Sequence, residues 1–225
     1  MAGMAMSLRV VVPPHPLIAQ WLTVLRDTGT PSPLFATAVL ELGRWLTYEA
    51  LRDWLPQRQV VVHTPLATSE GQVVDATAPL LAIPLLPAGL GLWEGARAVL
   101  PAAALAPLLA TQAAADPPGA TLQGLPSEIG ERVGVLVLVP ELAGSEPLLS
   151  LLDQLAARGV SGGRLRVITL VAGAPALRQL GERHEDLSIY CACIDGEVDG
   201  KGRLLPGFGD ATRRFTGSDA LIGLG

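Results

Sequence analysis

The apolar residues of this chain follow one spacing before Pro56 and another after it. Over Pro16–Trp54 they recur every three or four residues, as at Leu42, Trp45 and Leu46, which predicts two helices, the second of them long. Beyond Pro56 they form short runs bounded by glycine and proline, which predicts strands at Val60–Val62, Leu80–Leu86, Ala104–Leu109, Val133–Val139, Leu165–Val171 and Leu187–Ile194. Helical stretches lie between several of these strands, at Leu92–Leu100, Glu146–Ala157 and Ala174–Glu185.

Alternating strands and helices predict an α/β layer sandwich with a mainly parallel core sheet. Such sheets bind ligands outside the carboxyl ends of their strands, so we expect the site in the loops that follow Leu86, Leu109, Val139 and Ile194. No internal repeat or linker divides the chain. The segment Gln112–Pro126, rich in Ala, Pro and Gly, is either a mobile loop or an ordinary surface connection.

Charged residues are scarce. They make up 16% of the 225 residues, whereas 49% are hydrophobic, and a typical soluble domain has about 25% charged residues. This composition excludes intrinsic disorder. The net charge is -5 and no cluster of lysine or arginine occurs, so we expect no nucleic acid as a partner.

Two uncharged stretches, Ala76–Trp93 and Ala98–Ala115, each have 18 residues, which is the length of a membrane-spanning helix. Prolines interrupt both, Pro84 in the first and Pro107 in the second. Buried strands and a short helix account for the same residues. We therefore expect no membrane partner.

The two cysteines, Cys191 and Cys193, are two residues apart, a spacing that gives poor disulfide geometry on a strand. They are typical of buried thiols in a reducing cytoplasm, which is where we expect the protein. The three histidines, His15, His63 and His184, show no ligand spacing, so no metal site is predicted.

A glycine-rich segment, Gly89-Leu90-Gly91-Leu92-Trp93-Glu94-Gly95, follows a predicted strand and opens a predicted helix. This is the setting of a dinucleotide-binding fingerprint, but Glu94 stands where the third glycine of G-x-G-x-x-G belongs. A carboxylate there competes with a pyrophosphate for the helix N-terminus. The segment does not predict a nicotinamide site.

Several short motifs occur in a specific order and spacing: His15–Ile18, Leu25–Thr28, Tyr48–Asp53, Thr64–Leu66, Ala88–Gly91, Ile189–Tyr190, Ile194–Asp195 and Pro206–Ala211. Between His15 and Gly217 this pattern resembles the uracil phosphoribosyltransferase family. The resemblance implies a type I phosphoribosyltransferase fold and a homodimer. It also implies that phosphoribosyl pyrophosphate (PRPP) with magnesium lies over the sheet, and that a small C-terminal hood reads uracil largely through main-chain groups.

The resemblance implies a single domain over residues 1–225. Its parts are an N-terminal extension (1–14), a helical part (15–56), the core sheet (57–186), the hood with the base-binding loop (187–217) and a tail (218–225).

The base-binding half of the family's site is retained. The residues that the resemblance assigns to the base are Tyr190, Ile194, Leu205, Gly207 and Phe208. If the chain is active, Asp210 is the catalytic residue that helps to orient the ribose.

The phosphate-binding half departs from the family. A loop of the form D-P-M-L-A-T-G-G-S reads V-P-E-L-A-G-S-E-P over Val139–Pro147, and Pro87 replaces an arginine that binds pyrophosphate. The degenerate phosphate loop thus contains Val139, Glu141, Gly144, Ser145 and Glu146. Val139 removes a carboxylate that would face the ribose hydroxyls, and Glu146 adds negative charge where a phosphate should lie.

The family's G-D-A-G-D-R reads Gly209-Asp210-Ala211-Thr212-Arg213-Arg214 here. The two arginines either bind a phosphate from another direction or face solvent.

These departures lead us to expect a catalytically inactive homologue. It would act through a nucleobase or uridine nucleotide, or through a protein partner, without cofactors. The alternative is an active uracil phosphoribosyltransferase that forms UMP and pyrophosphate in pyrimidine salvage and uses magnesium.

Overall fold

The computed structural model describes residues 8–100, 102–109 and 124–218. Within these ranges seven strands form one sheet in the order β1-β9-β8-β7-β4-β5, and β6 also pairs with β4. All paired strands in this sheet are parallel. The strands are β1 (Arg9–Val11), β4 (Leu80–Leu86), β5 (Ala103–Leu105), β6 (Leu108–Leu109), β7 (Gly134–Leu142), β8 (Leu165–Gly173) and β9 (Ser188–Asp195).

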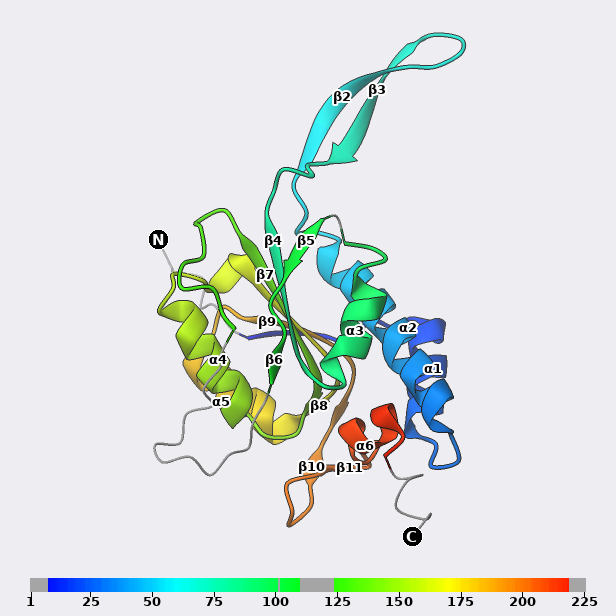
Figure 1. Cartoon of the computed structure of the whole chain (residues 1–225), viewed down its shortest axis with the longest axis vertical. Coiled ribbons are helices and arrows are strands. Elements are labelled where there is room, and N and C mark those ends of the chain that lie inside the picture. Colours follow the sequence, from blue (N-terminus) through cyan, green and yellow to red (C-terminus); the bar gives the residue numbers. More distant parts are fainter. Residues whose placement is uncertain (1–7, 101, 110–123, 219–225) are drawn as a thin grey trace.

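Helices cover both faces of the sheet (Figure 1). One face carries α1 (Pro16–Arg26), α2 (Ser32–Leu51) and α3 (Gly89–Ala96), and the other carries α4 (Glu146–Ala156) and α5 (Ala174–Arg183). A 3-10 turn (Gly162–Arg164) leads into β8. Each face has its own apolar cluster, and the alternating residues of the central strands divide between the two clusters. The predicted α/β sandwich with a mainly parallel sheet is confirmed.

The two predicted N-terminal helices are confirmed as α1 and α2. Phe35, Ala38, Leu42 and Leu46 of α2 are fully buried, as their spacing requires. The predicted strand Ala104–Leu109 is instead two short strands, β5 and β6. Pro107 lies between them and has no N–H to give to a ladder.

The predicted strand Val60–Val62 lies outside the core sheet. It belongs to an antiparallel hairpin, β2 (Gln57–His63) and β3 (Thr68–Val74), that projects from the body (Figure 1). Val61 is 66% exposed. A run of three valines satisfies the apolar pattern of a buried strand, but its neighbours on both sides are polar, so nothing covers it within the described chain.

The C-terminal part forms a small unit at one end of the molecule (Figure 1). Strands β10 (Glu197–Val198) and β11 (Leu204–Leu205) pair as an antiparallel hairpin. The loop of residues 205–210, called the C-terminal loop below, then leads into α6 (Ala211–Thr216).

Among the described residues, no helix is both long and apolar enough to cross a membrane. The stretch Ala76–Trp93 contains β4 and most of α3. Of the segment Gln112–Pro126, residues 112–123 lie outside the described part of the chain, so its mobility stays a prediction.

Candidate active site

The carboxyl ends of the central strands lie side by side at one edge of the sheet. Leu142 at the end of β7 pairs with Ala172 of β8, which pairs with Ile194 of β9. The loop after β7, the loop after β4 and the C-terminal unit all start from this edge (Figure 1). This is where open parallel sheets bind their ligands.

A buried ion pair anchors the C-terminal loop to this edge. Asp195, the last residue of β9, is 4% exposed, and its Oδ1 lies 2.6 Å from Nη2 of Arg26 at the end of α1. The main-chain N–H of Gly207 donates to Asp195 Oδ2 at 2.8 Å, and Arg26 Nη1 donates to the carbonyl of Gly207 at 3.0 Å. Both main-chain polar groups of Gly207 are thus held by this pair.

The C-terminal loop has a backbone that suits glycine. Gly207 and Gly209 have φ values of +57° and +81°, and the Leu205–Pro206 peptide bond is cis. A Cβ at Gly207 would also collide with the carbonyl of Leu204. Phe208 between the glycines is 3% exposed and packs on Phe35 of α2, with ring centroids 6.0 Å apart.

Arg214 holds the same loop from the other side and does not face solvent. Its Nη1 donates to the carbonyls of Phe208 at 2.6 Å and Leu25 at 2.7 Å, and its Nη2 donates to the carbonyl of Asp27 at 2.6 Å. The guanidinium lies 4.5 Å from the centroid of the Phe35 ring. Burial lowers the pKa of Arg214 from its ordinary value. The sequence left two alternatives for this arginine, binding a phosphate or facing solvent. Arg214 does neither, because it binds main-chain carbonyls.

The structure brings most of the predicted base-binding residues together, with different exposures. Ile194 and Leu205 are 44% and 45% exposed, whereas Gly207 and Phe208 are buried. Tyr190 is 1% exposed and belongs to the apolar cluster under α2, and its buried hydroxyl has no hydrogen-bond partner among the described residues. The side chains open to a ligand are therefore those of Ile194 and Leu205, and the base-binding roles stay predictions.

Asp210 is exposed at the end of the C-terminal loop. Its Oδ1 accepts a hydrogen bond from the main-chain N–H of Arg213 at 2.9 Å, so it caps α6.

The loop between β7 and α4 leaves the N-terminus of α4 open. Ser145 at the N-cap makes no capping bond, because its hydroxyl donates to Gln179 of α5 at 2.5 Å. Glu146 is exposed, and nothing lies within 4 Å of a Cβ built on Gly144. Pro147 in the first turn has no N–H, so this turn has one donor fewer for an anion, and the main-chain N–H groups of Glu146 and Leu148 are left.

Val139 lies in the core, 6% exposed, and offers no polar group. Glu141 lies further along β7 and is half-buried beside the hood strand β11. Burial raises the pKa of the Glu141 carboxyl above its usual value of 4.5, and the charges of Asp210 and Asp195 act in the same direction. A hydrogen bond with the main chain of Leu204 opposes them.

The glycines of the segment Gly89–Gly95 serve packing. A Cβ at Gly95 would collide with the carbonyl of Leu40 in α2, and a Cβ at Gly91 would lie 2.5 Å from the ring of Phe215. Pro87 lies half-buried at the carboxyl end of β4, after a cis bond from Leu86.

Comparison with known proteins identifies the family. A family model described as uracil phosphoribosyltransferase matches residues 12–217. The chain belongs to this family. A uracil phosphoribosyltransferase of Synechococcus elongatus is 46% identical over 96% of this chain and 100% of its own length. A Nostoc protein of the same name is 42% identical over the same shares. The structure of the AQ2163 protein from Aquifex aeolicus covers 92% of this chain and 97% of its own, with 25% identity and a TM-score of 0.77.

These relatives overturn the expectation of a catalytically inactive homologue. Proteins that carry the name of the enzyme are 39–46% identical to this chain over 93–96% of its length. The expectation rested on side chains lost from the phosphate loop. Main-chain N–H groups at a helix N-terminus bind a phosphate without those side chains, and α4 retains those of Glu146 and Leu148 beside Pro147.

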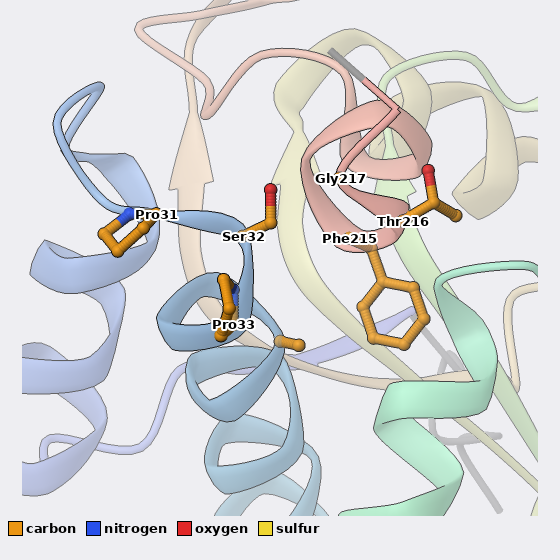
Figure 2. A pocket seen from close by; sticks show the side chains of 7 residues that line it. Pro31, Ser32, Pro33, Phe215, Thr216 and Gly217 are labelled. Atoms are coloured by element: carbon orange, nitrogen blue, oxygen red, sulfur yellow. The ribbon is translucent and has the colours of Figure 1, made fainter. Parts of the chain in front are cut away.

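In this uracil phosphoribosyltransferase family member an apolar pocket lies between the start of α2 and α6 (Figure 2). It is lined by Pro31, Ser32, Pro33, Ala36, Phe215, Thr216 and Gly217. Figure 2 shows the ring of Phe215 projecting from α6 into the space between α2 and α3. No lining residue is charged, so this pocket does not suit a phosphorylated sugar.

Both cysteines are free thiols in β9. Burial raises the pKa of Cys191 to about 12, and it also raises that of Cys193, whose Sγ lies 2.8 Å from Nη2 of Arg26. Neither thiol is activated as a nucleophile. Across residues 8–100, 102–109 and 124–218, no group of three or more His, Cys, Asp or Glu side chains is placed to hold a metal ion.

Sequence reasoning missed Arg26 and Asp195 as partners, although both lie in motifs quoted for the family. The signal was one cation and one carboxylate in otherwise apolar segments, but they are 169 positions apart. Their pairing depends on the packing of α1 across β9.

Proposed function

We propose that this chain is an active uracil phosphoribosyltransferase. The reaction breaks the bond between the anomeric carbon of PRPP and pyrophosphate, joins that carbon to N1 of uracil, and releases the N1 proton. The observation that carries the proposal is the 46% identity to a uracil phosphoribosyltransferase across that protein's whole length.

The site divides into two halves at the edge of the sheet. The C-terminal loop and Ile194 bind the base, and the N-terminus of α4 binds the 5′-phosphate. Asp210, which joins the C-terminal loop to α6, faces the ribose. Its charge stabilises the positive charge that develops at the anomeric carbon as pyrophosphate leaves.

In the proposed reaction magnesium binds together with PRPP, on the pyrophosphate of the substrate. The side-chain donors in the described part of the chain do not form a metal site of their own.

The test is formation of UMP from labelled uracil and PRPP with magnesium, followed by chromatography. The protein should be purified from a host that lacks its own uracil phosphoribosyltransferase, so that contaminating enzyme makes no product. We expect turnover of uracil and none of cytosine. A folded, pure preparation that forms no UMP contradicts the proposal.

We infer a role in pyrimidine salvage, since the reaction recovers free uracil as a nucleotide. Two free thiols in one strand suit a reducing compartment, which supports the cytoplasm as the location.

We also propose a homodimer, with the hairpin of β2 and β3 as the contact. Val62 and Val73 on one face of the hairpin and Leu66 at its tip are exposed. A two-stranded ribbon on its own is marginal in water. A second copy that packs on these valines would stabilise the ribbon.

A further inference from the structure

Two arginines, one from α1 and one from α6, donate hydrogen bonds to the main chain of the C-terminal loop. Arg26 reaches the loop from the end of α1, and Arg214 reaches from α6 back to the end of α1. Together they are called the arginine clamp below. Each guanidinium binds one loop carbonyl and at least one group outside the loop, so the clamp ties the loop to two separate elements.

The Arg26 half closes a ring of hydrogen bonds around one residue. Nη1 and Nη2 of Arg26 meet Oδ2 and Oδ1 of Asp195 at 3.2 and 2.6 Å. Asp195 accepts the N–H of Gly207, and Arg26 donates to the carbonyl of Gly207. A planar guanidinium makes these contacts at once, which an ammonium group cannot reproduce.

The Arg214 half stabilises the residue that follows. It binds the carbonyl of Phe208 together with those of Leu25 and Asp27, which end α1. A cation is favourable at that end of a helix. The Phe35 ring also contacts both Phe208 and the Arg214 guanidinium, so packing and charge act on the same stretch of loop.

The loop has little else to order it. Two of its six residues are glycines with positive φ, which lose more backbone freedom on ordering than other residues. Only Gly207 and Phe208 within it are buried. A loop that must order when it binds a ligand loses affinity by the cost of that ordering.

We propose that Arg26 and Arg214 are positioning residues of the base site. They hold the C-terminal loop in the conformation that binds uracil, and they touch neither uracil nor PRPP. The role for uracil rests on the proposed function, whereas the ordering of the loop rests on the contacts alone.

The experiment compares Arg26→Gln and Arg214→Gln with Arg52→Gln as the matched control. The Arg52 side chain is 69% exposed and forms an ion pair with Glu49 at the C-terminal end of α2, which is the end opposite to α6. Hydrogen–deuterium exchange of peptides that cover residues 203–212 measures the order of the loop. Steady-state kinetics measure KM for uracil and for PRPP separately.

We expect faster exchange in residues 205–210 and a KM for uracil raised about tenfold or more in both clamp variants, because each loses hydrogen bonds made by a charged group. The KM for PRPP should stay within about twofold. Arg26→Lys keeps a charge for Asp195 and should fall between wild type and Arg26→Gln. The control should match wild type in all three measurements.

Arg26→Gln leaves the buried carboxylate of Asp195 without a cation, and the variant can unfold for that reason. The double variant Arg26→Gln/Asp195→Asn removes both charges, so no unpaired charge stays buried. It therefore separates an effect on loop order from a loss of overall stability. We expect it to fold and still to show fast exchange in the loop.

Exchange in residues 205–210 that equals wild type in Arg214→Gln and in the double variant overturns the proposal. So does a KM for PRPP that rises in parallel with the KM for uracil. If wild type itself forms no UMP, the proposed function fails, and the exchange rates alone decide whether the clamp orders the loop.

Discussion

The carboxylate of Asp210 accepts a hydrogen bond from the main-chain N–H of Arg213 at 2.9 Å while the side chain stays exposed to solvent. One oxygen of Asp210 therefore caps α6, and the other is open to a ligand. The residue that the family assigns to the ribose has a structural role as well, and a test of catalysis has to separate the two.

Asparagine at position 210 separates them, because it caps a helix as well as aspartate does but carries no charge. We expect Asp210→Asn to keep wild-type stability and to lose about a hundredfold in kcat, since the charge would act on the transition state. Asp210→Ala should lose the same activity and also about 0.5–2 kcal/mol of stability from the missing cap. UMP formation and urea unfolding measure the two effects. An Asp210→Asn variant as active as wild type refutes the catalytic role.

Glu146 places a negative charge in the first turn of α4, where the phosphate is proposed to bind. We expect Glu146→Gln to lower KM for PRPP by about fivefold at low salt, because unit charges about 4 Å apart in water repel by about 1 kcal/mol. The gain should shrink as salt screens the charge. Kinetics at two ionic strengths measure it, with Glu182→Gln in the last turn of α5 as a control. An unchanged KM at low salt would place the phosphate elsewhere.

The raised pKa of Glu141 predicts how stability depends on pH. Burial favours the neutral carboxyl, so the folded state is favoured below the usual pKa of 4.5, and this contribution is lost as pH rises through the folded-state pKa. Glu141→Gln should therefore be more stable than wild type at pH 7.5, and the difference should vanish below pH 4.5. Urea unfolding at both pH values is the measurement. A destabilised variant at pH 7.5 would mean that the carboxylate has a favourable partner.

The apolar pattern was sufficient for elements with one regular buried face. In α2 the buried residues repeat every three or four positions, and in β8 all nine residues are buried between two helical layers. The same pattern was misleading at Val60–Val62, because three valines look alike in a core strand and in a projecting hairpin. Whether a strand is buried depends on the segments that pack on it, which its own residues do not show.

The site was harder to predict than the fold. The glycines and Asp210 mark the C-terminal loop in the sequence, whose base-binding role stays a prediction, but the clamp could not be predicted, since Arg26 and Asp195 are far apart in sequence. The error about activity had a similar cause. The motif at Val139 and Glu146 describes side chains, whereas a phosphate at a helix N-terminus is bound by main-chain N–H groups, which most residue types supply equally.

The close packing of α3 on α2 predicts a large effect from one methyl group. Gly95→Ala places a Cβ against the carbonyl of Leu40 and the main-chain N of Arg44, which only a shift of the helices can relieve. Alanine raises helix propensity by about 1 kcal/mol, but we expect overpacking to win and to lower stability by about 1–3 kcal/mol. Gly200→Ala, with open space around it, is the control. Equal melting temperatures for the two variants would contradict this packing.

The hairpin gives the last prediction. Val60 and Val62 lie on the same face of β2, opposite Gly71 and Ser69 of β3, and the pair of Arg58 and Val73 lies next to them on this face. If a second copy covers it, lysines at both positions place charges in the contact without disturbing the core of either monomer. We expect Val60→Lys/Val62→Lys to shift a dimer to monomer in light scattering after gel filtration, with an unchanged melting profile for the body. Gln59→Lys on the other face should remain a dimer, and a wild-type monomer at high concentration would contradict the proposed contact.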